Sequence, residues 1–201
     1  ITDVVHIGIG GSFLGPALAC EALGPGTGPR LHFLANVDGV AAQRTLAGLD
    51  PTRTVIIVAS KSFSTLETQV NARTVRRWFL TRGLSEGDLK HHCLAITTQL
   101  DAAAAFGIPP EQCLPLWDWV GGRFSLWSPM GLPVAIAQGM KTFEALLAGA
   151  RAMDEHFRTA DGAQNLPLLL SLFEFWNQNV LGTQSHAILP YADALTQLPA
   201  Y

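Results

Sequence analysis

The 201-residue sequence predicts an α/β fold with three layers, in which a parallel β-sheet carries helices on both faces. Short apolar runs alternate along the chain with segments of helical periodicity. The runs are apolar at consecutive positions, as in TVIIVAS at residues 54–60, which is typical of strands buried on both faces. Hydrophobic residues make up 48% of the chain, enough for the core of one domain.

Each predicted strand is an apolar run that ends before a glycine or a polar residue. The first strand, VVHIGI, runs into a glycine-rich loop, and the third is rich in β-branched residues. The last run, HAIL, is short and predicts only a minor strand. The predicted strands cover residues 4–9, 31–37, 54–60, 92–97, 113–117 and 186–189.

The predicted helices follow from capping signals and apolar spacing. Pro16 suits the first turn of the first helix, and Asp38 is expected to cap a second helix that runs through Leu49. Gly83 suits the end of the third helix. The predicted helices start at about residue 16 and then cover residues 39–49, 65–82, 132–138, 142–158 and 168–180.

Charge and hydropathy exclude several classes of protein. With 13 basic and 16 acidic residues the net charge is −3, which argues against a nucleic-acid or membrane-surface binder. No apolar stretch is long enough to span a membrane, and the most apolar one contains Glu174. Both ends fall inside predicted elements, so we expect a piece of a longer chain.

The cysteines predict free thiols rather than disulfides or a metal site. Cys20, Cys93 and Cys113 are odd in number and lie far apart in apolar stretches, which is typical of buried thiols in a reducing, cytoplasmic compartment. His91 and His92 precede Cys93 directly, and neighbouring side chains of a strand point to opposite faces. We therefore predict no metal site at this triplet.

Ligands of parallel α/β sheets bind beyond the carboxyl ends of the strands, so the loops after the first, third and fifth strands are the candidate site. In the first loop, GIGGSFLGP, a dinucleotide fingerprint would need glycine in place of Phe13, and a nucleotide phosphate loop would need lysine in place of Pro16. The glycines, the Ser12 hydroxyl and the following helix still favour a general anion site, and a tight turn without a ligand remains the alternative.

The second loop, SKSFSTLET, combines hydroxyls with one of the three lysines of the chain, Lys61. Hydroxyls, backbone amides and an ammonium at a helix start can wrap a phosphate monoester, which is the interpretation we favour. The alternative, compatible with the first, is a capping box from Ser64 to Glu67. The hydroxyls belong to Ser60, Ser62, Ser64, Thr65 and Thr68.

The third loop, DWVGGRFS, places Arg123 directly after two glycines. An arginine at this edge of the sheet can stabilise a developing oxyanion or bind a carboxylate, because its rigid guanidinium keeps its charge. A structural salt bridge is the alternative. The aromatic residues around Arg123 could line a pocket, but most are more simply expected to be core or domain-packing residues. They are Trp117, Trp119, Phe124 and Trp127.

Together, IGIGGSFLGP, SKSFSTLET and VGGRFSLWSPMGLP resemble, in this order, the signature segments of the glucose-6-phosphate isomerase (phosphoglucose isomerase) family. HAILPYADAL also resembles that family, and the similarity extends from Val4 to Tyr201. The resemblance implies that residues 1–201 form a single sugar-isomerase (SIS) domain with a flavodoxin-like, doubly wound sheet. It also implies that residues 140–201 pack as a helical extension toward a second domain of a longer isomerase.

The resemblance implies a site for a phosphosugar, glucose 6-phosphate or fructose 6-phosphate, without a metal or organic cofactor. Arg123, with Gly122, would stabilise the enediolate that forms while a proton moves between C1 and C2. Gly11 and Ser12 would lie against the sugar. The phosphate would be held by Ser60, Ser62, Thr65 and the backbone amide of Lys61, with Thr68 close by.

This chain departs from the family at some positions. Phe13 stands where the family often has aspartate, and Ser62 and Ser64 stand where it often has threonine. Nothing in the chain matches the family's catalytic glutamate, and His186 does not match its ring-opening histidine. We therefore expect the 201 residues to hold the phosphate site and the oxyanion arginine without the general base, and to be inactive alone.

The resemblance further implies a cytoplasmic, homodimeric enzyme of glycolysis and gluconeogenesis. Two other functions remain open. One is a regulatory SIS module that binds a sugar phosphate without chemistry. The other is a dinucleotide-dependent oxidoreductase with Asp38 as the ribose-binding acid, which Phe13 and the hydroxyls of the second loop disfavour.

Overall fold

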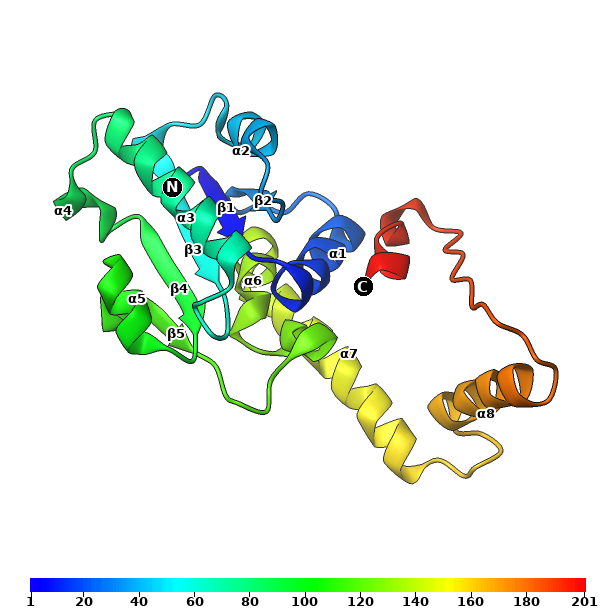
Figure 1. Cartoon of the computed structure of the whole chain (residues 1–201). Helices are drawn as coiled ribbons and strands as arrows, with labels where there is room; N and C mark the ends of the chain where they lie inside the picture. Colours follow the sequence, from blue (N-terminus) through cyan, green and yellow to red (C-terminus); the bar gives the residue numbers. More distant parts are fainter.

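The computed structural model describes residues 1–201 and contains one five-stranded sheet with strand order β2-β1-β3-β4-β5 (Figure 1). All four neighbouring pairs run parallel. This arrangement confirms the predicted fold class, including the flavodoxin-like order. The strands are β1 (Asp3–Ile7), β2 (Arg30–Leu34), β3 (Thr54–Ala59), β4 (Cys93–Thr97) and β5 (Cys113–Pro115).

The helices largely follow the sequence prediction. Asp38 caps α2 as expected, since its carboxylate accepts a hydrogen bond from the Val40 amide, although α2 ends at Leu46 and not at Leu49. The sequence did not predict α4 and α5, which are too short to give a helical apolar pattern. The helices are α1 (Leu14–Leu23), α2 (Gly39–Leu46), α3 (Leu66–Thr81), α4 (Glu86–Leu89), α5 (Leu100–Phe106), α6 (Leu132–Gln138), α7 (Met140–Thr159) and α8 (Leu166–Asn179).

The sheet is buried on both faces, which explains why its strands are apolar at consecutive positions. Val5 and Ile7 of β1 belong to a core cluster with Phe79 of α3. Val4 of the same strand belongs to a second cluster on the opposite face, against which Ile136 of α6 packs. Because successive side chains of β1 are buried on opposite faces, the register of the strand is fixed. The glycine loop therefore begins at a defined point, directly after Ile7.

The prediction of a strand at residues 186–189 was wrong. This segment has no regular structure, and Ile188 and Leu189 are exposed. A strand needs a neighbour for its backbone hydrogen bonds, and the segment lies away from the sheet (Figure 1). Apolar composition alone therefore did not produce a strand here.

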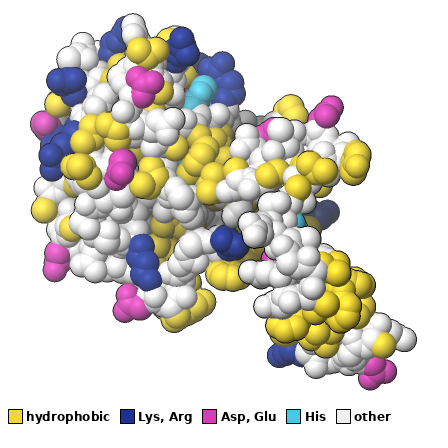
Figure 2. All heavy atoms as spheres, turned by 45° about the vertical axis from the view of Figure 1, so that its right-hand side comes forward, with side chains coloured by type: hydrophobic (Ala, Val, Ile, Leu, Met, Phe, Trp, Pro, Cys, Tyr) yellow, Lys and Arg dark blue, Asp and Glu magenta, His cyan; other side chains and the backbone are white.

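The last third of the chain projects from the sheet layers (Figure 1). Helix α7 leads away from the body to α8, which has no buried residue, and hydrophobic side chains gather on this projecting part (Figure 2). Leu170, Phe173 and Phe175 of α8 are each more than 60% exposed. The chain then returns to α1, where the Tyr201 hydroxyl donates a hydrogen bond to the Arg123 carbonyl.

The three cysteines are free thiols, as predicted. Cys93 is buried, whereas Cys20 and Cys113 are half-buried, so the expectation of buried thiols is confirmed for Cys93 and only partly met by the other two. Burial raises the pKa of the Cys20 and Cys93 thiols to about 12. None of the helices has both the length and the apolar character that crossing a bilayer requires.

Candidate functional site

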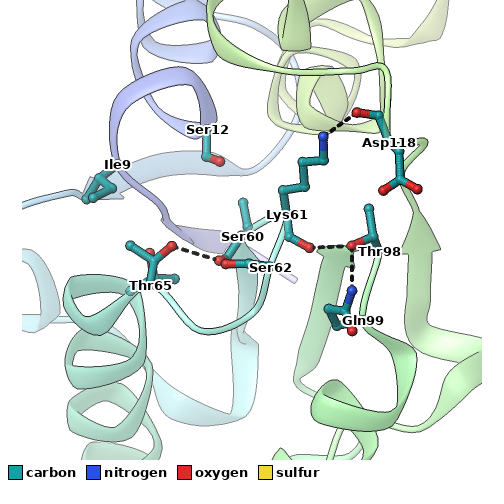
Figure 3. Close-up of a pocket in the computed structure, with 11 residues that line it drawn as sticks. Ile9, Ser12, Ser60, Lys61, Ser62, Thr65, Thr98, Gln99 and Asp118 are labelled. Atoms are coloured by element: carbon teal, nitrogen blue, oxygen red, sulfur yellow. Dashed lines mark hydrogen bonds between the residues drawn. The ribbon is translucent and has the colours of Figure 1, made fainter.

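A pocket of about 510 Å³ lies beyond the carboxyl ends of the central strands (Figure 3). The loops after β1, β3, β4 and β5 all contribute to it, and only two of its eleven lining residues are hydrophobic. The structure therefore brings residues from separate loops of the predicted site to one place. The predicted site residues that line it are Ser12, Ser60, Lys61, Ser62, Thr65 and Thr68.

Phe63 explains why the loop after β3 presents its hydroxyls to the pocket. Its side chain is buried in the core against Phe106, with ring centroids 6.0 Å apart. Its backbone is left-handed, with φ of 49°, the only positive φ outside glycine, which costs on the order of 1–3 kcal/mol. The side-chain Nε2 of Gln69 donates to the Phe63 carbonyl at 2.7 Å and holds this conformation. With the Phe63 side chain buried, the neighbouring Ser62 and Ser64 are exposed.

The hydroxyls of this loop are not used to cap α3. Thr65 is the N-cap residue and makes no side-chain capping bond, so the predicted capping box from Ser64 to Glu67 was wrong. Instead the Ser60 hydroxyl donates to Thr65 Oγ1 at 3.2 Å (Figure 3). The first N–H groups of α3 therefore remain free for an anion.

Thr68 supplies a further unsatisfied group. Its side chain is 1% exposed, it lines the pocket, and its Oγ1 has no hydrogen-bond partner. Buried hydroxyls in folded proteins nearly always have a partner. A ligand oxygen in the pocket would give Thr68 the bond it lacks.

His6 of β1 is hydrogen-bonded to the glycine loop that follows this strand. The ring is fully buried, and its Nε2 donates to the Ser12 carbonyl at 2.6 Å. Burial lowers the pKa of His6 to about 4, with the bond to Ser12 opposing that shift, so the ring is neutral near pH 7. Phe13 packs edge-on against Phe33 of β2 and does not line the pocket.

The loops after β1 and β5 touch through two predicted site glycines. A Cβ atom placed on Gly11 would lie 2.4 Å from the carbonyl oxygen of Gly122. Gly122 itself has φ of +55°, a conformation that favours glycine. Gly11 and Gly122 do not line the pocket, but their contact joins two of its loops.

Arg123 follows the pocket-lining Asp118 by five residues in the loop after β5, and its side chain is not among the lining residues. Arg123 is exposed, and it forms no salt bridge with an acidic side chain. The alternative of a structural salt bridge was therefore wrong. Trp117 and Trp119 stack on each other at 5.5 Å and are 53% and 80% exposed, so neither is a core residue, and packing against another domain stays a prediction.

The Lys61 ammonium was expected to help wrap a phosphate, but in the structure it is hydrogen-bonded within the protein. The ammonium donates to the carbonyl oxygens of Asp118 and Val120 in the loop after β5. Only its backbone amide and stem remain for the ligand side of the pocket. The positive charge nearest the pocket is therefore already bonded within the protein.

The sequence did not single out Thr98, Gln99 and Asp118, which also line the pocket. Thr98 and Gln99 follow β4 directly, and Asp118 follows β5. The rule that ligands bind at the carboxyl ends of parallel strands would have found Thr98 and Gln99 if it had been applied to the fourth strand as well. Asp118 begins the loop DWVGGRFS, of which only the glycines, the aromatic residues and Arg123 were singled out from the sequence.

His, Cys, Asp and Glu side chains do not gather in groups of three anywhere in the structure. His92 Nδ1 lies 2.7 Å from the Thr54 carbonyl, so this ring is bonded to the backbone. The donor set of the pocket consists instead of hydroxyls, amides and the free N–H groups of α3. Such donors suit a phosphate rather than a metal ion.

Sequence comparison relates the whole chain to one family. The family model described as phosphoglucose isomerase matches residues 1–201. Glucose-6-phosphate isomerase 2 of Cupriavidus pinatubonensis is 56% identical over 203 residues, which cover 100% of this chain and 38% of the relative. The glucose-6-phosphate isomerase of Roseobacter denitrificans is 52% identical over 202 residues, with the same coverage of both chains.

Comparison with solved structures relates the chain to the same family. The crystal structure of a glucose-6-phosphate isomerase from Chlamydia trachomatis superposes with a TM-score of 0.88 at 35% identity, over 100% of this chain and 38% of that one. A hypothetical protein from Thermus thermophilus gives a TM-score of 0.81 at 33% identity and is covered to 47%. The chain thus spans less than half the length of these relatives, 38% to 47%. With a family match over every residue and with structural similarity over the full length, this chain belongs to the phosphoglucose isomerase family.

Proposed function

We propose that this chain forms the phosphosugar-binding part of a glucose-6-phosphate isomerase, which interconverts glucose 6-phosphate and fructose 6-phosphate through an enediolate. The observation that carries the proposal is the hydroxyl-lined pocket at the uncapped start of α3. Its free N–H groups and unpaired Thr68 hydroxyl are donors that a phosphate monoester can satisfy. The names of the relatives support the same substrate.

In this proposal the phosphate accepts hydrogen bonds from Ser60, Ser62, Thr65 and the Lys61 amide. The Thr68 hydroxyl, in the first turn of α3, donates a further hydrogen bond to the phosphate. The sugar extends from the phosphate toward the loop after β1, against Gly11 and Ser12. Hydrogen bonds to a charged phosphate contribute roughly 1.5–3 kcal/mol each, so a few of them suffice for specific binding.

Arg123 acts at the other end of the sugar. The contact of Gly11 with Gly122 sets the arginine loop beside the sugar-binding loop. The guanidinium, which is exposed and free of carboxylate partners, reaches the oxygens of the enediolate when substrate is bound and stabilises their charge. The general base that moves the proton between C1 and C2 comes from outside these 201 residues, which alone do not turn over the substrate.

The projecting part of the chain belongs to the assembly of the whole enzyme. We propose that residues 140–201 extend toward a second domain of a homodimeric isomerase. The apolar side chains of α8 are exposed in this structure, which supports burial of this helix against the second domain or the other subunit.

The position of the Arg123 side chain outside the pocket lining favours a second candidate, a regulatory module that binds a sugar phosphate without chemistry. Steady-state kinetics of Arg123→Ala in the natural full-length protein separate the two. An isomerase is expected to lose about 100-fold or more in kcat with a much smaller change in KM, because the guanidinium acts mainly in the transition state.

Equal losses in kcat and in substrate affinity would instead assign Arg123 to ordinary substrate binding. A wild-type protein that binds glucose 6-phosphate without converting it would support the regulatory module. Glucose 6-phosphate is expected to protect the amides of residues 60–68 from hydrogen exchange, and tighter binding of NAD than of the phosphosugar would contradict both candidates.

A further inference from the structure

Lys61 makes hydrogen bonds to the loops that follow two other strands. Its backbone carbonyl accepts from Thr97 Oγ1 at 3.0 Å, from Thr98 Oγ1 at 2.8 Å and from the Thr98 amide at 3.0 Å. Its ammonium reaches in the other direction, to the carbonyl oxygens of Asp118 and Val120, the latter at 3.0 Å. One residue of the loop after β3 therefore joins the ends of β4 and β5 (Figure 3).

The segment that the ammonium holds has few other restraints. No other side chain forms a hydrogen bond with residues 117–122. Trp117 and Trp119 are exposed, and only Val120 is buried within this segment. Gly121 and Gly122, the last two residues of this segment, have no side chains to fix their conformation. Beside the burial of Val120 and the backbone contact of Gly122 with Gly11, the two N–H···O bonds from Lys61 are the side-chain hydrogen bonds that hold this segment.

Arg123 follows this segment directly, so the direction in which its side chain leaves the backbone depends on residues 118–122. The proposed phosphate cradle, in contrast, uses the hydroxyls of the loop after β3 and the Lys61 backbone amide, and not the Lys61 ammonium. We infer that the Lys61 ammonium is a positioning residue, which fixes the loop after β5 so that Arg123 is aimed at the reacting carbons. The part of this inference that concerns turnover rests on the function proposed above.

Turnover and phosphate affinity respond differently to the loss of a positioning ammonium and to the loss of a phosphate-binding one. If Lys61 positions the arginine loop, its loss lowers turnover and loosens residues 118–122 while phosphate binding stays nearly intact. If Lys61 binds phosphate through its ammonium, its loss weakens phosphate binding and turnover alike. Misplacing a catalytic group by about 1 Å costs on the order of 100-fold in rate.

The test uses Lys61→Met in the natural full-length protein, because methionine keeps the length of the stem and removes the donors. We expect kcat to fall about 10- to 100-fold, the dissociation constant for inorganic phosphate to change less than about 3-fold, and the amides of residues 118–122 to exchange about 10-fold faster. Lys61→Arg, which keeps charge and donors, is expected to restore much of the turnover. Lys90→Met, at an exposed position just after α4 that does not line the pocket, is the matched control and should behave like wild type.

Unchanged exchange in residues 118–122, or a loss of phosphate affinity equal to the loss of kcat, would overturn the inference. A wild-type protein without isomerase activity would overturn the proposed function instead, while exchange rates and phosphate binding would still decide the role of Lys61. Reductive methylation of the unmodified protein gives a measurement that needs no variant. Lys61 is expected to react more slowly than the exposed Lys90 and Lys141, and equal rates would contradict the tie to the two carbonyls.

Discussion

Gly11 is the position at which a single methyl group tests the geometry of the site most directly. In Gly11→Ala the new Cβ would lie 2.4 Å from the Gly122 oxygen, 2.7 Å from its carbonyl carbon and 2.9 Å from its Cα. All three are backbone atoms, so no side chain can rotate away. Contacts of Cβ below 3.0 Å essentially never occur, and the two loops must therefore part by about 0.6 Å at least.

The expected cost has two components. Overpacking of a tight contact destabilises a fold by roughly 1–3 kcal/mol, which thermal or urea unfolding would detect. Moving the arginine loop away from the sugar-binding loop by a large fraction of 1 Å is expected to lower kcat by about 10- to 100-fold. Inorganic phosphate should still bind with nearly wild-type affinity, since its cradle lies in the loop after β3.

Gly121→Ala is the matched control in the same loop. A Cβ on Gly121 meets no atom within 4 Å, and its backbone, with φ of −171°, is extended and open to any residue. The assay compares kcat, KM and the unfolding midpoint of the two variants in the full-length protein. A Gly11→Ala variant as active and as stable as Gly121→Ala would refute the claim that the loops meet through these glycines.

Two further predictions concern buried titratable groups. The unfolded state binds a proton at His6 below about pH 6.5, whereas burial keeps the folded pKa near 4, so the free energy of unfolding should fall by about 3 kcal/mol as the pH drops from 7 to 4. Urea unfolding of wild type and His6→Gln measures this, and parallel pH dependences of the two proteins would contradict it. Burial raises the pKa of Cys93 to about 12, so the thiol should react with a disulfide reagent at pH 8 only as fast as the protein unfolds. The half-buried Cys113 in the same sample serves as the comparison, and labelling of Cys93 at the rate of Cys113 would argue against its burial.

The sequence alone determined the class of the fold and the positions of its loops. Apolar runs that alternate with helical segments are local properties, and they sufficed for five parallel strands and for most helices. The same pattern failed at residues 186–189, where an apolar run has no neighbouring strand to pair with. It also missed α5, whose seven residues end at the left-handed Gly107 before any periodicity develops.

The candidate loops were also identifiable from their residue types, because glycines and hydroxyls after buried strands have few other uses at that edge of a sheet. What each side chain does there could not be read from the chain. Phe63 was unremarked in the sequence, yet its burial with a positive φ presents the hydroxyls to the pocket. Ser64 matched a capping box in sequence but does not cap α3.

Tertiary structure alone decided which loops touch and where the charges lie. The Lys61 ammonium bonds carbonyl oxygens that are 57 and 59 residues away in the chain, and Gly11 contacts Gly122. Such contacts depend on the order and twist of the strands between them, which no local pattern specifies. The sequence set the chemistry available at the edge of the sheet, and the packing of the strands selected which groups meet.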